Sequence, residues 1–261
     1  MSLFEKDDIV EEAINFLKEN EPEEGYYLCF SGGKDSLVSK QLLILSRVKW
    51  TGGYSFPGFD PPEIVAYIKK YHSDIEILSS QSFFKNVGRL GPPDIFRRWC
   101  CDIQKKAPQK NIENKHRVHG VRAEEGSKRA KRDRINKFRK ELHYYPIFYW
   151  KEWEVWEFIE KQNLPYCKLY DIPMIHRIGC CICPYQSKQE RKFSQIRWPG
   201  YWKAYKKALF TFYKNIKGKE RETEFYQQYP TFEEFWEWLG NKGEWKPKSK
   251  TKNNLKLNLG K

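Results

Sequence analysis

Six consecutive residues, SGGKDS at positions 31–36, carry the clearest chemical signal in the chain. They follow the apolar run 26–30 and open a stretch of helical composition, 34–46. Glycines at the start of a helix expose backbone N–H groups that bind an anion, and the helix dipole adds favourable charge. The spacing is not that of the Walker A loop. We expect a phosphate group, with Mg²⁺ on the carboxylate, to be held by Ser31, Gly32, Gly33, Lys34, Asp35 and Ser36.

Four of the seven cysteines form two close pairs with the chemistry of metal ligands. Cys100 and Cys101 are adjacent, and Cys180 and Cys183 have the CxxC spacing. Four thiolates ligate either a 4Fe-4S cluster or a structural zinc ion. Adjacent cysteines are awkward for zinc, and a glycine and a proline flank the second pair as in a tight turn around a metal. A cluster, zinc and no metal stay as three alternatives.

Short apolar runs alternate with helical segments through the first part of the chain. This alternation predicts an α/β fold with a doubly wound, mostly parallel sheet covered on both faces. The predicted strands are 26–30, 48–53, 74–78 and 117–121, and the predicted helices are 5–20, 34–46, 63–71 and 152–161. Ligands of such sheets bind where the strand order reverses, so the loop after the first strand and the residues around Arg122 should converge.

The rest of the chain has a different composition. Residues 201–245 are helical in propensity and rich in aromatic side chains, and residues 246–261 are polar and rich in lysine. We predict a nucleotide-binding domain with the cysteine cluster over residues 1–200, a helical C-terminal cap over 201–245 and a mobile tail over 246–261. Aromatic residues at helical spacing form a core more often than a binding surface.

The composition of the chain indicates which binding partners and which cellular compartment to expect. The 261 residues carry a net charge of +14, which favours polyanions such as nucleotides and nucleic acid, although a solvated lysine-rich surface gives the same value. No apolar run approaches the length of a membrane span, and no signal peptide is recognisable. We therefore expect a cytoplasmic protein without a membrane partner. An odd number of cysteines in a reducing compartment favours metal binding or catalysis over disulfides.

The SGGKDS loop resembles the SGGxDS signature of the PP-loop ATP pyrophosphatases, and its place between a strand and a helix fits that superfamily. The resemblance implies an adenine nucleotide alpha hydrolase-like fold. It also implies that ATP is split to AMP and pyrophosphate while a substrate oxygen is adenylated. Lys34 and Asp35 would then be catalytic, since backbone donors, lysine and metal stabilise the leaving pyrophosphate.

A longer resemblance covers residues 24 to 200. The blocks RRWCC with a following lysine and proline (97–108), GVRAEEGSKR (120–129), PIF to EVW (146–156), LPY to LY (164–170) and RIGC to CPY (177–185) resemble, in order, those of the phosphoadenosine phosphosulfate (PAPS) reductase family. That family implies a 4Fe-4S cluster on the four cysteines and places Lys105 near the cluster and the substrate anion. Lys105 and Arg122 are then expected to be catalytic together with Lys34 and Asp35. It also makes Arg122, Ser127 and Arg129 phosphate or sulfonate contacts, although Gly126 is inserted before the serine.

The chain departs from sulfonucleotide reductases at two places. No cysteine follows Cys183, so the nucleophile of their C-terminal motif is missing, and the phosphate loop is complete rather than degenerate. The combination looks most like the Dnd-type DNA phosphorothioation ATPase and the cluster-dependent tRNA thiolation enzymes. The resemblance implies ATP-dependent sulfur transfer to nucleic acid, with a cysteine desulfurase or a thioredoxin-like protein as donor.

Two other functions stay open. The chain could be an adenylyl or phosphoadenylyl sulfate reductase that uses an external thiol. It could also be a regulator that binds nucleotide and cluster without turnover. Release of pyrophosphate from ATP separates the first function from the second, which would release sulfite, and any turnover excludes the third.

Overall fold

The structure is a computed structural model that describes residues 4–216 and 222–241. It divides into two compact units, one of residues 1–83 and 94–185 and the other of residues 84–93 and 186–261. The helices and strands, in chain order, are α1 (Phe4–Glu19), β1 (Tyr26–Cys29), α2 (Lys34–Ser46), β2 (Trp50–Phe56), α3 (Pro62–Tyr71), β3 (Glu76–Ser79), α4 (Phe83–Leu90), η1 (Cys101–Lys106), η2 (Ala107–Gln109), β4 (His116–Val118), η3 (Ala123–Glu125), α5 (Ser127–Ala130), β5 (Ile135–Phe138), β6 (Glu141–Tyr144), α6 (Glu152–Lys161), η4 (Lys168–Asp171), α7 (Lys188–Arg197), α8 (Pro199–Lys214), α9 (Glu222–Gln228) and α10 (Phe232–Asn241).

The first unit contains a six-stranded sheet with the order β3-β2-β1-β4-β6-β5. All neighbouring strands pair in parallel except β5 and β6, which form an antiparallel hairpin at one edge. The strand order reverses between β1 and β4, so the loops after these two strands meet at the position where doubly wound sheets bind ligands. The predicted α/β fold is confirmed.

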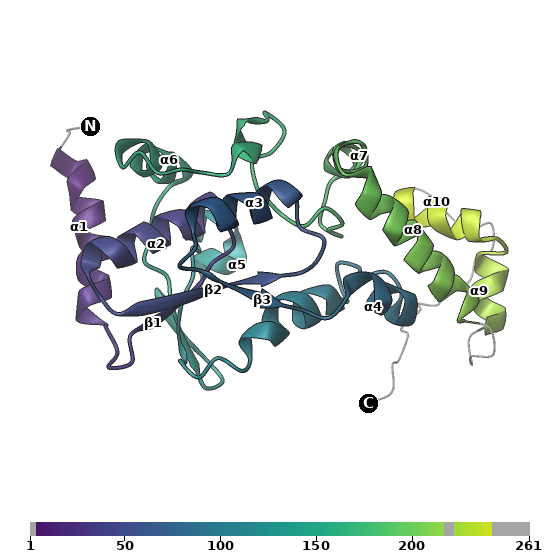
Figure 1. Cartoon of the computed structure of the whole chain (residues 1–261), viewed down its shortest axis with the longest axis horizontal. Coiled ribbons are helices and arrows are strands. Elements are labelled where there is room, and N and C mark those ends of the chain that lie inside the picture. The colour runs from purple at the N-terminus through teal and green to yellow at the C-terminus, as the bar shows by residue number, and fades with distance from the viewer. Residues whose placement is uncertain (1–3, 217–221, 242–261) are drawn as a thin grey trace. The chain divides into compact units, whose positions relative to one another are not determined.

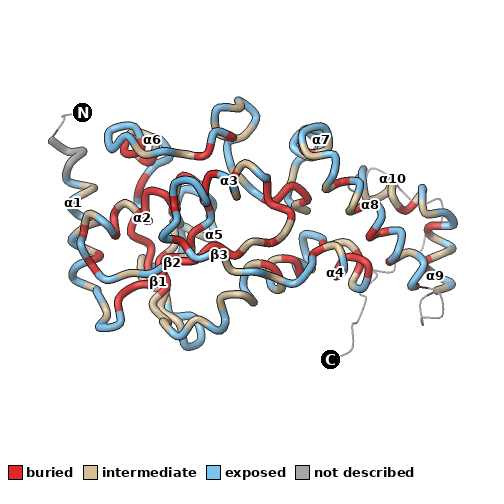
Figure 2. Tube along the Cα trace, in the orientation of Figure 1, coloured by how far each residue is buried: buried red, intermediate tan, exposed pale blue. Residues whose placement is uncertain are grey.

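Helix α2 is the central helix of this unit (Figure 1). It is buried on most of its circumference, and α1, α6 and β1 contact it. A helix enclosed in this way shows no single apolar face, which suits the sequence KDSLVSKQLLILS. The π-helical turn η1 contacts β2. Figure 2 shows the buried residues concentrated along β1 and α2, which fixes the start of α2 on a rigid base.

Several sequence predictions differ from the structure in detail. Strand β4 ends at Val118, three residues before the predicted end, because the following residues turn toward the start of α2. The hairpin β5–β6 was not predicted, since its strands are short and its sequence INKFRKELHY is mostly polar, as edge strands often are. The helices α4 and α7 were also missed.

The second unit consists of helices in its described part, as the aromatic sequence after residue 200 predicted. Phe225, Tyr229 and Phe235 are buried and contact one another with ring centroids 5.1 to 5.3 Å apart. Gly91 has a φ of +81°, and a side chain there would lie within 2.7 Å of the Phe212 ring. Residues 84–93 therefore pack directly on α8.

The boundaries predicted at residues 200 and 245 stay predictions, and the predicted mobile tail, 246–261, lies outside the described residues. No helix among residues 4–216 and 222–241 is long and apolar enough to cross a bilayer. The predicted cytoplasmic location stays a prediction.

Candidate functional site

The phosphate loop is ordered by its own serines. Ser36 Oγ donates to the Gly33 carbonyl at 2.9 Å and accepts from the Ser31 N–H at 3.2 Å, while the two hydroxyls lie 3.0 Å apart. Gly32 has a φ of +75°, which favours glycine, and a side chain there would contact Ile64 and Ile68 of α3 at 3.1 and 3.2 Å. The loop is thus closed before α2 begins at Lys34.

The hydroxyl of Tyr170 lies at the N-terminus of α2. It accepts a hydrogen bond from the Lys34 N–H at 3.1 Å, and a Cβ on Gly33 would lie 3.3 Å from it. Burial raises the pKa of this phenol to about 12, so the hydroxyl stays neutral at ordinary pH. The ring packs on Trp156 with centroids 5.0 Å apart. The uncharged Tyr170 hydroxyl of η4 therefore lies at the N-terminus of α2, where a helix can bind an anion.

The side chain of Lys34 is buried and surrounded by acceptors. Its Nζ lies 3.2 Å from Glu152 Oε1, 3.6 Å from Asp35 Oδ2 and 3.5 Å from the His176 carbonyl. It also lies 5.5 Å from the Tyr170 ring centroid. Because Glu152 is half exposed, the ammonium has one partner that an entering phosphate oxygen could replace.

The segment after β4 joins the phosphate loop. Arg122 Nε donates to Asp35 Oδ1 at 2.6 Å, and Arg122 also pairs with Glu124. A Cβ on Gly120 would lie 2.4 to 2.7 Å from the backbone of Asp35 and Ser36, so only glycine permits this approach. The convergence expected at the reversal of strand order is therefore present, with Asp35 engaged by a guanidinium.

Two further sequence candidates lie on the short helix α5. Ser127 is its first residue and is exposed, and Arg129 forms an ion pair with Glu125. Gly126, the inserted residue, has a φ of +153° and open space around it. The expected role of Ser127 and Arg129 as phosphate contacts stays a prediction.

The four cysteines come from two segments of the first unit. Cys100 and Cys101 stand at the start of η1, and Cys180 and Cys183 belong to a turn that the Cys181 N–H fixes by donating to the Phe59 carbonyl at 3.0 Å. The hydrogen bond to Cys101 and burial raise the pKa of Cys100, and Cys180 and Cys183 raise it further. The same hydrogen bond lowers the pKa of Cys101 to about 6. The two cysteine pairs are therefore close enough for the thiols of one to affect the ionisation of the other.

Lys105 and Asp60 interact electrostatically with the cysteines. The Cys180 thiol and the Asp60 carboxylate raise the pKa of the Lys105 ammonium. Asp60 is buried, and its Oδ2 accepts from the Tyr54 hydroxyl at 2.6 Å. Lys105 is recognisable from the sequence, whereas the only sequence signal of Asp60 is an acidic residue inside the apolar loop FPGFDPP.

The chemistry of these four thiols suits an iron–sulfur cluster. Four thiols from two segments meet a lysine that balances negative charge. Among the described residues, no three His, Cys, Asp or Glu side chains converge closely enough to hold a single metal ion. Each thiolate of a four-iron cluster binds its own iron, so the sulfur atoms around it need not converge on one point.

Three other residues of the site were missed by sequence reasoning. Tyr170 and Glu152 contact Lys34, and Gly120 fits against Asp35. Tyr170 and Gly120 lie in blocks noted for their resemblance to a family, but nothing in one sequence shows that they touch the phosphate loop.

Comparison with known proteins adds independent information. A family model described as "Phosphoadenosine phosphosulfate reductase domain" matches residues 25–186. The chain is 30% identical over 213 residues to an uncharacterized protein of Methanocaldococcus jannaschii, a match that covers 76% of this chain and 44% of the relative. It is 33% identical over 105 residues to adenosine 5'-phosphosulfate reductase of Oceanobacillus iheyensis, over 39% of this chain and 43% of the relative. The chain spans less than half the length of these relatives.

Solved structures agree on the fold. Phosphoadenylyl-sulfate reductase of Candida auris superposes with a TM-score of 0.51 at 15% identity, covering 69% of this chain and 96% of that chain. FMN adenylyltransferase of Candida glabrata, solved with FAD and inorganic pyrophosphate, gives a TM-score of 0.53 at 14% identity over 67% and 64% of the two chains. At these identities the likeness extends to the fold alone.

Proposed function

The chain belongs to the phosphoadenosine phosphosulfate reductase domain family, and from this premise we propose that it is an ATP pyrophosphatase that adenylates a substrate oxygen for sulfur transfer. The substrate oxygen attacks the α-phosphorus of ATP, and the bond to the bridging oxygen breaks. Pyrophosphate leaves with the bonding electron pair. Sulfide then displaces AMP and gives the thiolated substrate directly. A persulfide would displace AMP to give a disulfide between donor and substrate, which a dithiol of the thioredoxin class would reduce to free the thiolated product.

One observation carries this proposal: the complete SGGKDS loop lies against the segment of Arg122. Lys34 and Arg122 are both buried, and both lie within 3.6 Å of Asp35. Fixed cations and backbone donors in a water-poor site stabilise the charge that develops on a leaving pyrophosphate. If Asp35 binds Mg²⁺, its ion pair with Arg122 weakens. The Arg122 guanidinium is then available to contact the phosphates.

The cysteines support the sulfur half of the reaction. A 4Fe-4S cluster on Cys100, Cys101, Cys180 and Cys183 would supply a site for binding and activating sulfur when it is bound. The residues of this chain would balance its charge, since the Lys105 ammonium interacts electrostatically with Cys180 and Asp60. Zinc, the other alternative from the sequence, would need ligands that converge on one ion, and no three His, Cys, Asp or Glu side chains of the described residues do so.

The acceptor that fits best is nucleic acid. The chain combines a complete phosphate loop with the CC and CxxC pairs, as the Dnd-type phosphorothioation ATPase and tRNA thiolation enzymes do. Its net charge of +14 suits a polyanion. A cysteine desulfurase would supply the sulfur, or a thioredoxin-like protein the electrons.

A second candidate is reduction of adenylyl sulfate by an external thiol. The 33% identity to adenosine 5'-phosphosulfate reductase of Oceanobacillus iheyensis favours it. In this reaction the attacking thiol would come from outside the 261 residues given, because none of those after Cys183 is a cysteine.

The two candidates differ in ligand and product. Protein purified without oxygen would be incubated with ATP, Mg²⁺, sulfide and single-stranded nucleic acid, or with adenylyl sulfate and thioredoxin. Pyrophosphate and AMP from the first mixture are the expected result. Sulfite from the second, with no pyrophosphate from the first for any acceptor, would establish the reductase instead. Turnover of ATP would exclude the remaining alternative, a regulator that binds nucleotide and cluster without turnover.

A further inference from the structure

The two units differ sharply in charge. Residues 84–93 and 186–261, which form the second unit, contain 20 Lys and Arg against 8 Asp and Glu, a net charge of +12. The first unit has 28 basic and 26 acidic residues, a net charge of +2. Nearly all of the net charge of the chain therefore belongs to the unit without the phosphate loop. A polyanion as large as nucleic acid would be attracted to the second unit.

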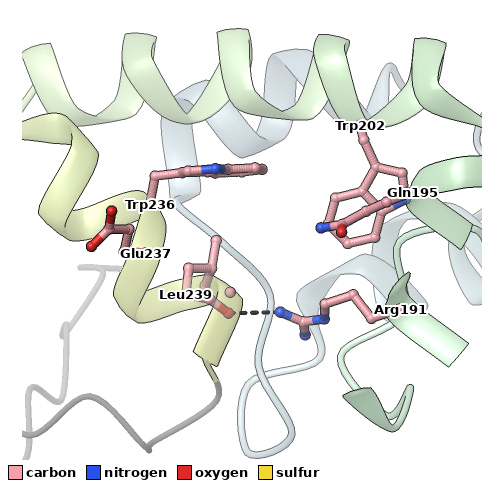
Figure 3. A pocket seen from close by; sticks show the side chains of 7 residues that line it. Arg191, Gln195, Trp202, Trp236, Glu237 and Leu239 are labelled. Carbon is pink, nitrogen blue, oxygen red and sulfur yellow. Dashed lines mark hydrogen bonds between the residues drawn. The ribbon is translucent and has the colours of Figure 1, made fainter. Parts of the chain in front are cut away.

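A cavity of about 160 Å³ lies within the second unit, between α7, α8 and α10 (Figure 3). The indole rings of Trp202 and Trp236 stand on opposite sides of it, and Arg191 lies below them. Gln195 and Glu237 add hydrogen-bonding groups to its wall. The cavity thus combines two aromatic surfaces with polar edges.

The walls of the cavity are held in place. Trp202 is 7% exposed, and its Nε1 donates to Ser194 Oγ at 3.0 Å. Arg191 Nη1 donates to the Leu239 carbonyl at 2.6 Å, and its guanidinium lies 5.9 Å from the Trp202 ring centroid. Trp236 lies 5.5 Å from the Lys206 ammonium, which is itself paired with Glu233 at 2.9 Å. Rings fixed in this way can bind a planar ligand without first being ordered.

Basic side chains lead to the cavity along one face of α7. Lys188, Arg191, Lys192 and Gln195 follow one another at positions i, i+3, i+4 and i+7, which share one face of a helix. Lys188 and Lys192 are exposed. A phosphate backbone lying along α7 would therefore bring its bases next to the opening between the two indoles.

We propose that the second unit binds single-stranded nucleic acid and that the cavity between Trp202 and Trp236 accepts one unpaired base. The proposal rests on the proposed function, because it identifies nucleic acid as the acceptor and gives it a place to bind. The size is compatible: an apolar cavity of about 150 Å³ admits a benzene ring, so a cavity of about 160 Å³ is large enough for one six-membered ring such as that of a pyrimidine base. Stacking on aromatic rings with a basic track for the phosphates is how single strands are generally bound.

The charge and the cavity together select this occupant. A duplex keeps its bases stacked, so it could use the basic track but not the cavity. An acidic peptide could also use the track, yet it offers the two indoles no flat ring unless it carries an aromatic side chain. An unpaired base with its phosphates uses both features.

The experiment measures binding of a fluorescent 12-residue single-stranded oligonucleotide to the full chain, without ATP, by fluorescence anisotropy. Trp236→Leu should weaken binding about 10-fold, since each stacked base contributes that much. Trp238→Leu is the matched control on the same helix, because the Trp238 ring packs on Tyr229 and Phe235 and does not line the cavity. Its binding should match that of the original chain.

A second variant blocks the cavity without removing a packed ring. Gly240 lines the cavity, and a Cβ there would meet no atom within 4 Å. Gly240→Leu should therefore fill the opening while helix α10 keeps its stability, and it should weaken oligonucleotide binding to a similar extent. Circular dichroism would verify that each variant is folded.

Three results would overturn the proposal: equal loss in Trp236→Leu and Trp238→Leu, full binding in Gly240→Leu, or equal affinity for single strand, duplex and polyglutamate. The proposed function fails separately. Oligonucleotide binding without pyrophosphate release would refute the adenylation reaction alone. Pyrophosphate release with a small acceptor, but no oligonucleotide binding, would refute the base site alone.

Discussion

The two units of the chain use charge in opposite ways. In the first unit the net charge is only +2, but the few charged side chains of the site are fixed in place: Lys34 and Arg122 are buried, and both pair with Asp35. In the second, aromatic rings form the core and the net charge is +12. The net charge of a whole chain therefore says little about its nucleotide site. Chemistry needs a few oriented charges, whereas attraction of a polyanion needs many unoriented ones.

The strongest way to separate the units is Lys34→Ala. Loss of a fixed cation at the phosphates should lower pyrophosphate release by about 100-fold or more, while oligonucleotide binding stays unchanged. Lys192→Ala is the matched control in the second unit, since this lysine is exposed on α7. It should leave pyrophosphate release from ATP with a small acceptor intact and weaken oligonucleotide binding. If both variants lost both activities, the comparison between the units would fail.

The next effect concerns iron. Cys183→Ser should remove most of the broad visible absorbance and the bound iron of anaerobically purified protein, because serine is a poor iron ligand. Cys167→Ser is the control, as Cys167 is buried beside η4 and outside the two pairs. Both proteins should bind the oligonucleotide equally. Similar iron loss in the two variants would contradict the ligand assignment.

Sensitivity to acid should belong to the first unit, which contains all five histidines. Burial, with the nearby Lys40 ammonium, lowers the pKa of His72 to about 4, from 6.5 in an unfolded chain. The folded state therefore binds a proton at His72 less readily than the unfolded chain does. His72 leaves the free energy of unfolding unchanged above pH 6.5 and lowers it as the pH falls toward 4. At pH 5 the free energy of unfolding should be about 2 kcal/mol lower from His72 alone.

Urea unfolding at pH 7.5 and pH 5.0 measures this loss. In His72→Gln the difference between the two pH values should shrink by about that amount, because glutamine does not titrate. An unchanged difference would show that His72 accepts a proton without unfolding. His119, whose pKa burial and His143 lower to about 3, should account for part of what remains.

The smallest effect is expected from Tyr170→Phe, which removes the oxygen at the start of α2. One hydrogen bond contributes about 1 kcal/mol, so the affinity for ATP should change about 5-fold. It should rise if the hydroxyl competes with a phosphate and fall if it binds one. Tyr166→Phe is the control, since Tyr166 packs on the same Trp156 but donates to Asp171. Equal effects in both would trace the change to packing.

Local signals predicted the sheet and the loop well. The apolar run before SGGKDS and the helical composition after it fixed β1 and α2, and α2 was predicted with its observed bounds, 34–46. These elements are decided by neighbours in sequence, through glycine conformation and burial. The resemblance to a family then grouped Lys105 and Arg122 with the loop and the cysteines.

Long-range contacts set the limit of that prediction. Tyr170 touches Lys34 across 136 residues, and Gly120 meets Asp35 across 85. Composition around Tyr170 and Asp60 does not differ from that of an ordinary loop. The reversal of strand order brings Gly120 to Asp35, and the position of η4 brings Tyr170 to the start of α2. The single sequence states neither arrangement.

The order of synthesis separates residues 84–93 from the helix on which they pack. They are made early in synthesis, yet their packing partners, among them Thr211 and Phe212 of α8, are made after the whole of the first unit. At about 5–20 residues per second, the roughly 120 residues between them take about 6–24 s to synthesise. For that time residues 84–93 have no α8 to pack against. A chain cut after residue 185 would never supply it, so such a truncation should aggregate rather than yield a working nucleotide domain.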